Sequence, residues 1–202
     1  MVAAHRGLAG SGVPRRRWVA ASLAAALLVA LTVSFLMPKS GLFVERLEGT
    51  AFLVKQDGRR LALRLGDRVR PGDRIDTQAV VALEGKNGLK VTVNKDSKVL
   101  FEMSDRVTLL LESGAISVEA PETSVAILNG RDRRAVVTGK CEARFTSVAG
   151  YPNDPSKSSE FRIYVKRGDV RFEGPAGART LTEGQTMTVT DEGTTKVEEK
   201  RP

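Results

Sequence analysis

The feature that most constrains the fold is a stretch at residues 63–77, in which the dipeptide Gly-Asp occurs twice. In both copies, Gly66-Asp67 and Gly72-Asp73, a β-branched apolar residue follows two positions after the Asp. Gly permits a positive φ, the Asp side chain can hydrogen-bond to nearby backbone, and Val or Ile favours an extended chain. The stretch therefore predicts two tight turns, each leading into a short strand, and it does not resemble a catalytic loop.

Apolar and polar residues alternate with a period of two along most of residues 42–190, without a long 3.6-residue period. This alternation predicts strands at residues 44–54 (interrupted by Gly49), 61–65, 80–84, 89–93, 99–102, 107–111, 116–118, 125–128, 136–138, 143–148, 161–165, 170–173, 180–181 and 187–190. The Asn-Gly dipeptide within 85–88 predicts a hairpin. Residues 150–159, rich in Pro, Ser and Asp, predict a loop.

A weak internal repeat bears on the architecture. Gly49, Gly114 and Gly168 each begin a strand in which alternate residues are apolar. Either similar β units stack, as in a solenoid or roll, or the same turn chemistry recurs in a sandwich. We therefore predict an all-β domain of many short strands over residues 42–190, followed by a flexible charged tail over residues 191–202.

The N-terminal region contains a separate element. Residues 18–37 form an uncharged run of 20 residues, and a helix of that length spans about 30 Å, the thickness of a bilayer's hydrocarbon core. The residues that follow, Pro38-Lys39-Ser40, lack the small-residue pattern of a signal-peptide cleavage site. We predict a retained transmembrane helix, a signal anchor, over residues 18–37.

Charge fixes the expected orientation of that helix. Arg15, Arg16 and Arg17 precede the run, whereas only Lys39 follows closely, so the positive-inside rule keeps the basic tail of residues 1–17 in the cytoplasm. The domain that follows is then periplasmic, on the outer side of the cytoplasmic membrane. The net charge of +8 does not indicate a nucleic-acid ligand: residues 1–41 hold five basic residues and no acid, which leaves 27 basic against 24 acidic in the remainder.

The residue inventory excludes most catalytic classes. The single histidine, His5, lies in the N-terminal tail, and the single cysteine, Cys141, cannot form an intramolecular disulfide. Acid pairs such as Asp73 with Asp76 are more typical of turns and solvated faces than of a glycosidase. We expect no enzymatic activity, no cofactor and no metal site.

The motif of residues 63–77, L-x-x-G-D-x-V-x-x-G-D-x-I-x-T, resembles that of the FecR domain, an extracytoplasmic β module of bacterial envelope proteins. Further blocks at 109–118, 165–170 and 181–185 extend the resemblance over roughly residues 44–189. The resemblance assigns structural turn roles to Gly49, Gly66, Asp67, Gly72, Asp73, Thr77, Gly114, Gly168 and Gly184. It implies a periplasmic domain behind one membrane helix.

The best-known FecR-like proteins carry a signal from an outer-membrane siderophore receptor to a cytoplasmic sigma factor. That role uses a cytoplasmic domain, and residues 1–17 are too short to fold or to sequester a sigma factor. We therefore expect a sensing or binding domain that relays a signal through a protein partner in the membrane or periplasm. The alternative is a structural envelope scaffold or a module that binds polysaccharide.

Overall fold

The computed structural model describes residues 41–103, 106–121, 125–130, 132–148, 159–175, 177–190 and 195–199. The chain divides into two units, residues 1–40 and 41–202, and all of the described residues belong to the second. The predicted tail of residues 1–17 and the predicted membrane helix of residues 18–37 lie outside the described residues, as does nearly all of the predicted loop at 150–159.

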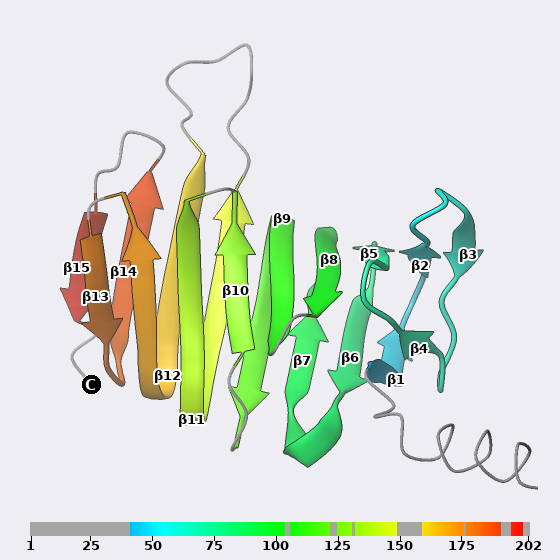
Figure 1. The fold of residues 1–202 in the computed structure, drawn as a ribbon, viewed down its shortest axis with the longest axis horizontal. Coiled ribbons are helices and arrows are strands. Elements are labelled where there is room, and N and C mark those ends of the chain that lie inside the picture. Colours follow the sequence, from blue (N-terminus) through cyan, green and yellow to red (C-terminus); the bar gives the residue numbers. More distant parts are fainter. Residues whose placement is uncertain are drawn as a thin grey trace, which may run out of the picture. The chain divides into compact units, whose positions relative to one another are not determined.

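Fifteen strands make up the described part of the second unit (Figure 1). They are β1 (Leu42–Glu48), β2 (Ala51–Val54), β3 (Arg60–Ala62), β4 (Arg68–Val69), β5 (Arg74–Thr77), β6 (Val80–Glu84), β7 (Lys90–Val93), β8 (Ser97–Met103), β9 (Val107–Ala120), β10 (Val125–Asn129), β11 (Arg133–Val148), β12 (Glu160–Gly174), β13 (Gly177–Leu181), β14 (Gln185–Thr190) and β15 (Thr195–Glu199). A single 3-10 turn, η1 (Lys86–Gly88), joins β6 to β7. The all-β prediction is confirmed for these residues, and none of their helices has the length and apolar character needed to cross a bilayer.

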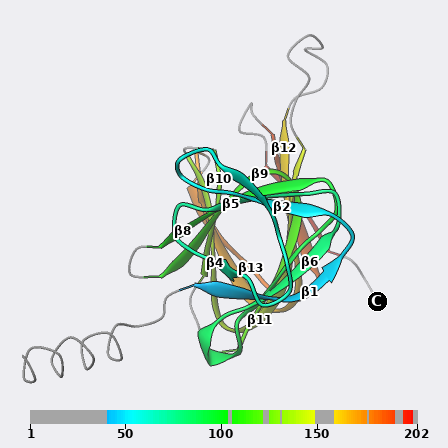
Figure 2. The ribbon, with the colours of Figure 1, turned by 90° about the vertical axis from the view of Figure 1, so that its right-hand side faces the viewer.

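The strands form one hydrogen-bonded sheet that folds over on itself into two facing layers, as the view along the unit in Figure 2 shows. The first layer has the order β15-β14-β12-β11-β9-β7-β6-β1-β4. The second has the order β13-β12-β11-β10-β9-β8-β5-β2-β3. Three strands, β9, β11 and β12, therefore belong to both layers.

These shared strands bend where they change layer. The bends lie at Gly114, Gly139 and Gly168, whose φ angles are +87°, +70° and +79°, values that glycine adopts without the strain other residues incur. The prediction of many short strands is wrong here, because β9, β11 and β12 run for 14, 16 and 15 residues. Each was expected as two strands, since the apolar alternation breaks at the bend, but the backbone pairing resumes directly beyond it.

The core lies between the two layers. Alternate residues of every long strand face inward, and the buried apolar set runs from Leu42 to Val189. Phe145 and Phe161 stack with ring centroids 6.3 Å apart, and Phe172 lies 6.4 Å from Phe161. Aromatic contacts of this kind add to the area that the rings bury. Residues 41–202 thus contain a complete hydrophobic core of their own.

The hairpin predicted from the Asn-Gly dipeptide is confirmed: β6 and β7 pair antiparallel, and Asn87 and Gly88 both have positive φ. The prediction of a flexible tail over residues 191–202 is wrong for residues 195–199. These form β15, which pairs with β14 and sets Val197 opposite Met187. An edge strand needs only one apolar face, so a segment poor in apolar residues can still complete the sheet.

Candidate binding surfaces

Three turns of the domain share one hydrogen-bonding pattern. They cover residues 64–67, 70–73 and 182–185, and in each the N–H of the fourth residue donates to the carbonyl of the first, at 2.9 to 3.1 Å. The side-chain oxygen of the fourth residue, Asp67, Asp73 or Gln185, accepts the N–H of the first at 2.8 to 3.0 Å. The third residue, Gly66, Gly72 or Gly184, has a φ of +79°, +84° or +82°. The apolar residues that flank these turns are buried, so each turn joins two strands of the core.

The two aspartates differ in their surroundings. The Asp67 carboxylate lies at the surface, whereas Asp73 is 4% exposed and also accepts a hydrogen bond from Lys55 Nζ at 2.8 Å. This ion pair links Asp73, just before β5, to Lys55, just after β2. Asp73 therefore joins two segments in addition to closing its turn.

The other family-like residues also lie at turns and bends. Gly49 lies between β1 and β2 with a φ of +110°. The buried Thr77 hydroxyl donates to the Ala79 carbonyl at 2.7 Å and accepts the Ala79 N–H at 2.8 Å. Gly114 and Gly168 lie at the strand bends. Of all nine predicted positions, only Asp67 and Gly114 contribute to the depressions described below.

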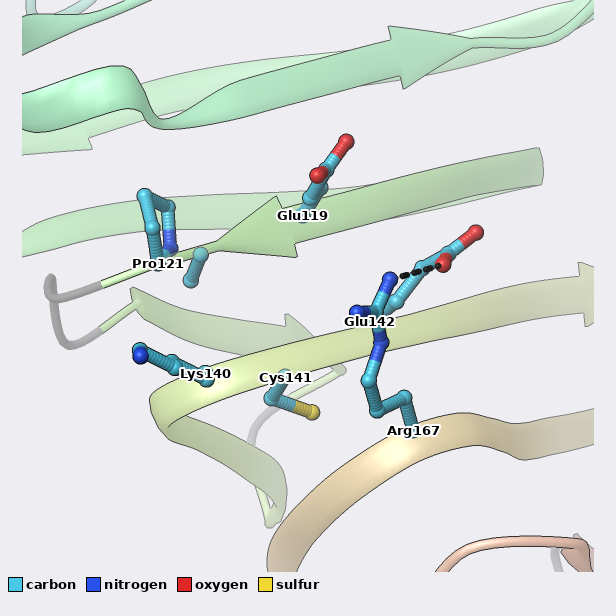
Figure 3. Close-up of a pocket in the computed structure, with 7 residues that line it drawn as sticks. Glu119, Pro121, Lys140, Cys141, Glu142 and Arg167 are labelled. Carbon is cyan, nitrogen blue, oxygen red and sulfur yellow. Dashed lines mark ion pairs between the residues drawn. The ribbon is translucent and has the colours of Figure 1, made fainter.

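A small pocket of about 150 Å³ lies where β9 ends and where β11 and β12 bend (Figure 3). Its lining includes Cys141, and burial of the thiol, with the nearby negative charge of Asp169, raises the pKa of Cys141 to about 11. A thiol with so high a pKa is protonated at neutral pH and is a poor nucleophile.

One carboxylate of this pocket, Glu142, is paired with two basic side chains. The Glu142 carboxylate lies 2.7 Å from Lys166 Nζ and 3.5 Å from the Arg167 guanidinium, and the hydrogen bond from Lys166 holds the pKa of Glu142 below its usual value. Figure 3 shows the Arg167 side chain reaching across to Glu142. Within the described part of the chain, no group of three or more His, Cys, Asp or Glu side chains is placed to hold a metal ion.

A larger, open groove of about 770 Å³ runs along the edge where β7 passes into β8 and where β9 bends. We call it the Asn94 groove; its lining is Val80, Asn94, Lys95, Ser113, Gly114, Ala115, Arg144, Thr146, Ser147 and Val148. The Nδ2 atom of Asn94 is buried and has no hydrogen-bond partner among the described residues. Val148, at the end of β11, is 48% exposed. The groove thus combines an unsatisfied donor, two basic side chains and an exposed apolar residue.

A polar network supports the groove from beneath. The Ser97 hydroxyl donates to the Ala115 carbonyl at 3.2 Å and accepts the Ala115 N–H at 2.9 Å. Asn129 Nδ2 donates to the Ser147 hydroxyl at 2.7 Å and to the Leu111 carbonyl at 3.1 Å. Sequence reasoning missed these residues, because nothing local marks a serine or asparagine that bridges strands distant in the sequence.

A third surface lies at the β1–β4 end of the unit, the end that faces the viewer in Figure 2. Three large apolar residues are exposed there: Phe43 (43%), Leu61 (46%) and Leu65 (65%). Leu61, Arg64 and Arg68 line a shallow groove of about 360 Å³, and the Arg68 guanidinium lies 5.6 Å from the centroid of the Phe43 ring. We call these five residues the β3–β4 end surface.

No protein-family model matches the chain, and no curated protein matches it either. Two crystal structures, at 1.65 and 2.50 Å resolution, of a presumed anti-sigma factor from Parabacteroides distasonis are similar in fold, each with a TM-score of 0.51 and 15% sequence identity. Each match covers 63% of this chain and 59% of the other. The likeness shows a fold like that of this anti-sigma factor, and it extends over little more than half of that protein's length.

Proposed function

We propose that this protein is a membrane-anchored, extracytoplasmic binding domain, without catalytic activity, that relays a signal through a partner protein. Three observations support the proposal: the fold shared with an anti-sigma factor, the FecR-like motifs of the sequence, and the uncharged run at residues 18–37. In this proposal the relay to transcription runs through a second protein in the membrane or periplasm.

The observation that carries the proposal is the Asn94 groove. Its volume of about 770 Å³ lies within the range of small-molecule and peptide sites, whereas the pocket beside Cys141 is too small for either. Asn94 lines the groove, and turning its buried Nδ2 outward onto a peptide carbonyl would remove the cost of a donor without an acceptor. Lys95 and Arg144 would favour an acidic segment of the partner, and Val148 would pack against an apolar side chain of that segment.

The test is site-specific photocrosslinking of the full chain in native membranes. A photoreactive residue replaces Val148 in the groove or, as a control, Ala178, an exposed residue on β13 at one end of the second layer. We expect a discrete protein adduct from position 148 and none from position 178.

The adduct must also matter for signalling. Arg144→Glu should abolish both the adduct and the transcriptional response lost on deleting the gene, whereas Arg179→Glu, an exposed charge reversal on β13, should leave both intact. Identical adducts from both positions, or an unchanged response with Arg144→Glu, would refute the proposal. Crosslinks to envelope glycan without any transcriptional phenotype would establish the structural alternative instead.

A further inference from the structure

We infer that the β3–β4 end surface docks on the headgroups of an anionic lipid bilayer. Its residues are Phe43, Leu61, Leu65, Arg64 and Arg68. This inference goes beyond the proposed function: it shares the membrane anchor with it but requires neither the partner nor the Asn94 groove.

The apolar part of the argument rests on clustering. An isolated exposed leucine is ordinary on a protein surface. Among the described residues, however, five large apolar side chains are exposed, and three of them gather at this one end. Phe43 lies opposite Arg68 in the β1–β4 ladder, and Leu65 occupies the turn just before β4. Aromatic and leucine side chains next to arginines are the composition that inserts at a bilayer interface.

The charge of the same segment complements lipid phosphate. Residues 59–70 contain five arginines and a single acid, Asp67. The Asp67 carboxylate accepts a hydrogen bond from the backbone N–H of Arg64. Within the described part of the chain, Arg64 and Arg70 take part in no ion pair. The Arg60 guanidinium lies over Phe52 and 3.6 Å from the Asp76 carboxylate, and the Arg68 guanidinium lies over Phe43. Arg64 is therefore the arginine of this surface whose guanidinium we expect to bind phosphate oxygens.

The length of the connecting chain brings lipid within reach. The predicted membrane helix ends at Met37, and three residues separate it from Gly41, which precedes β1. Three extended residues span at most about 11 Å, and β1 carries Phe43 and pairs with β4. The occupant favoured by both charge and reach is therefore the surface of the bilayer that holds the anchor.

The experiment uses the full chain reconstituted in vesicles of equal parts phosphatidylglycerol and phosphatidylcholine. In a Cys141→Ala background, a fluorophore is attached at Leu65→Cys or, as the control, at Ala178→Cys on β13, and spin-labelled lipid serves as the quencher. We expect strong quenching at position 65 and little at position 178. Pure phosphatidylcholine or high salt should reduce quenching at position 65, because both weaken the attraction between arginine and headgroup.

A charge reversal supplies the second readout. One basic residue near an anionic surface contributes about fivefold to binding, so Arg64→Glu should shift the docking equilibrium by more than fivefold. Arg179→Glu, the matched change on β13, should not. Equal quenching at both positions, quenching insensitive to lipid charge, or failure of the chain to partition into vesicles would each overturn the inference. The crosslink at Val148 is a separate readout, so the two proposals can fail independently.

Discussion

Replacing Gly168 with alanine tests whether the bends of the shared strands depend on close backbone approach. A Cβ built at Gly168 would lie 2.5 Å from the Lys140 carbonyl oxygen and 2.9 Å from the Cys141 Cα atom. Both are backbone atoms of the neighbouring strand, so relief requires that β11 and β12 move apart. At Gly139, in the bend of β11 itself, an added Cβ meets nothing within 4 Å.

The two sites share a positive φ, +79° at Gly168 and +70° at Gly139, so the comparison isolates the steric effect. An alanine in the left-handed region costs about 1 kcal/mol, and this is the expected loss of unfolding free energy for Gly139→Ala. At Gly168 an overpacking cost of about 1 to 3 kcal/mol adds to it. We therefore expect Gly168→Ala to lose about 2 to 4 kcal/mol.

Equilibrium unfolding in urea measures the difference on residues 41–202, which contain their own core. The single tryptophan, Trp18, lies outside this fragment, so circular dichroism is the appropriate signal. With a slope of about 2 kcal/mol per molar urea, the midpoint should fall by about 0.5 M for Gly139→Ala and by about 1 to 2 M for Gly168→Ala. Equal shifts would refute the reasoning, because backbone conformation alone would then explain both.

Three further predictions follow from the contacts of single residues. Asp73→Asn should lose about 2 kcal/mol of unfolding free energy and Asp67→Asn less than about 1, because both amides still accept the turn N–H but only Asp73 has a Lys55 partner; urea midpoints of both variants check this. The raised pKa of Cys141 means that the folded state holds its proton more tightly, so stability should fall as pH rises from 9 to about 11; unfolding midpoints of the native chain and of Cys141→Ala, which should lack this slope, test it. The lowered pKa of Glu142 contributes stability above its ordinary value of 4.5 that is lost as pH falls below it. Glu142→Gln should therefore cost less than about 1 kcal/mol at pH 7, and nothing at acid pH, in thermal denaturation.

The sequence predicts this fold best where a short motif determines backbone geometry. The Asn87-Gly88 hairpin and the Gly-Asp turns at Gly66 and Gly72 are local structures, and positive φ with side-chain hydrogen bonds to nearby backbone suffices to form them. The alternation of apolar residues likewise predicts which side chains face the core. The alternation does not predict which strands pair with one another, because the same pattern fits a solenoid, a roll or a sandwich.

The wrong predictions of strand boundaries and of the C-terminal tail arose where pairing between distant strands outweighs the local sequence pattern. A glycine such as Gly114 interrupts the apolar pattern, yet the strand continues, because β9 pairs with β8 up to Ser113 and with β11 from Gly114 onward. Thr195–Glu199 lacks the apolar content of a strand and is ordered by its pairing with β14. The Asn94 groove could not be predicted at all, because β6, the turn between β7 and β8, β9 and β11 each contribute only one or a few of its residues.

The three strands that belong to both layers have a mechanical consequence. In a sandwich whose sheets are joined only by loops, one sheet can slide over the other at the cost of side-chain contacts alone. Here such sliding would have to distort the covalent backbone of β9, β11 and β12 at their bends. A load applied to the outer face of one layer would be transmitted through these strands to the other, so the unit would rotate as a rigid lever and would not shear.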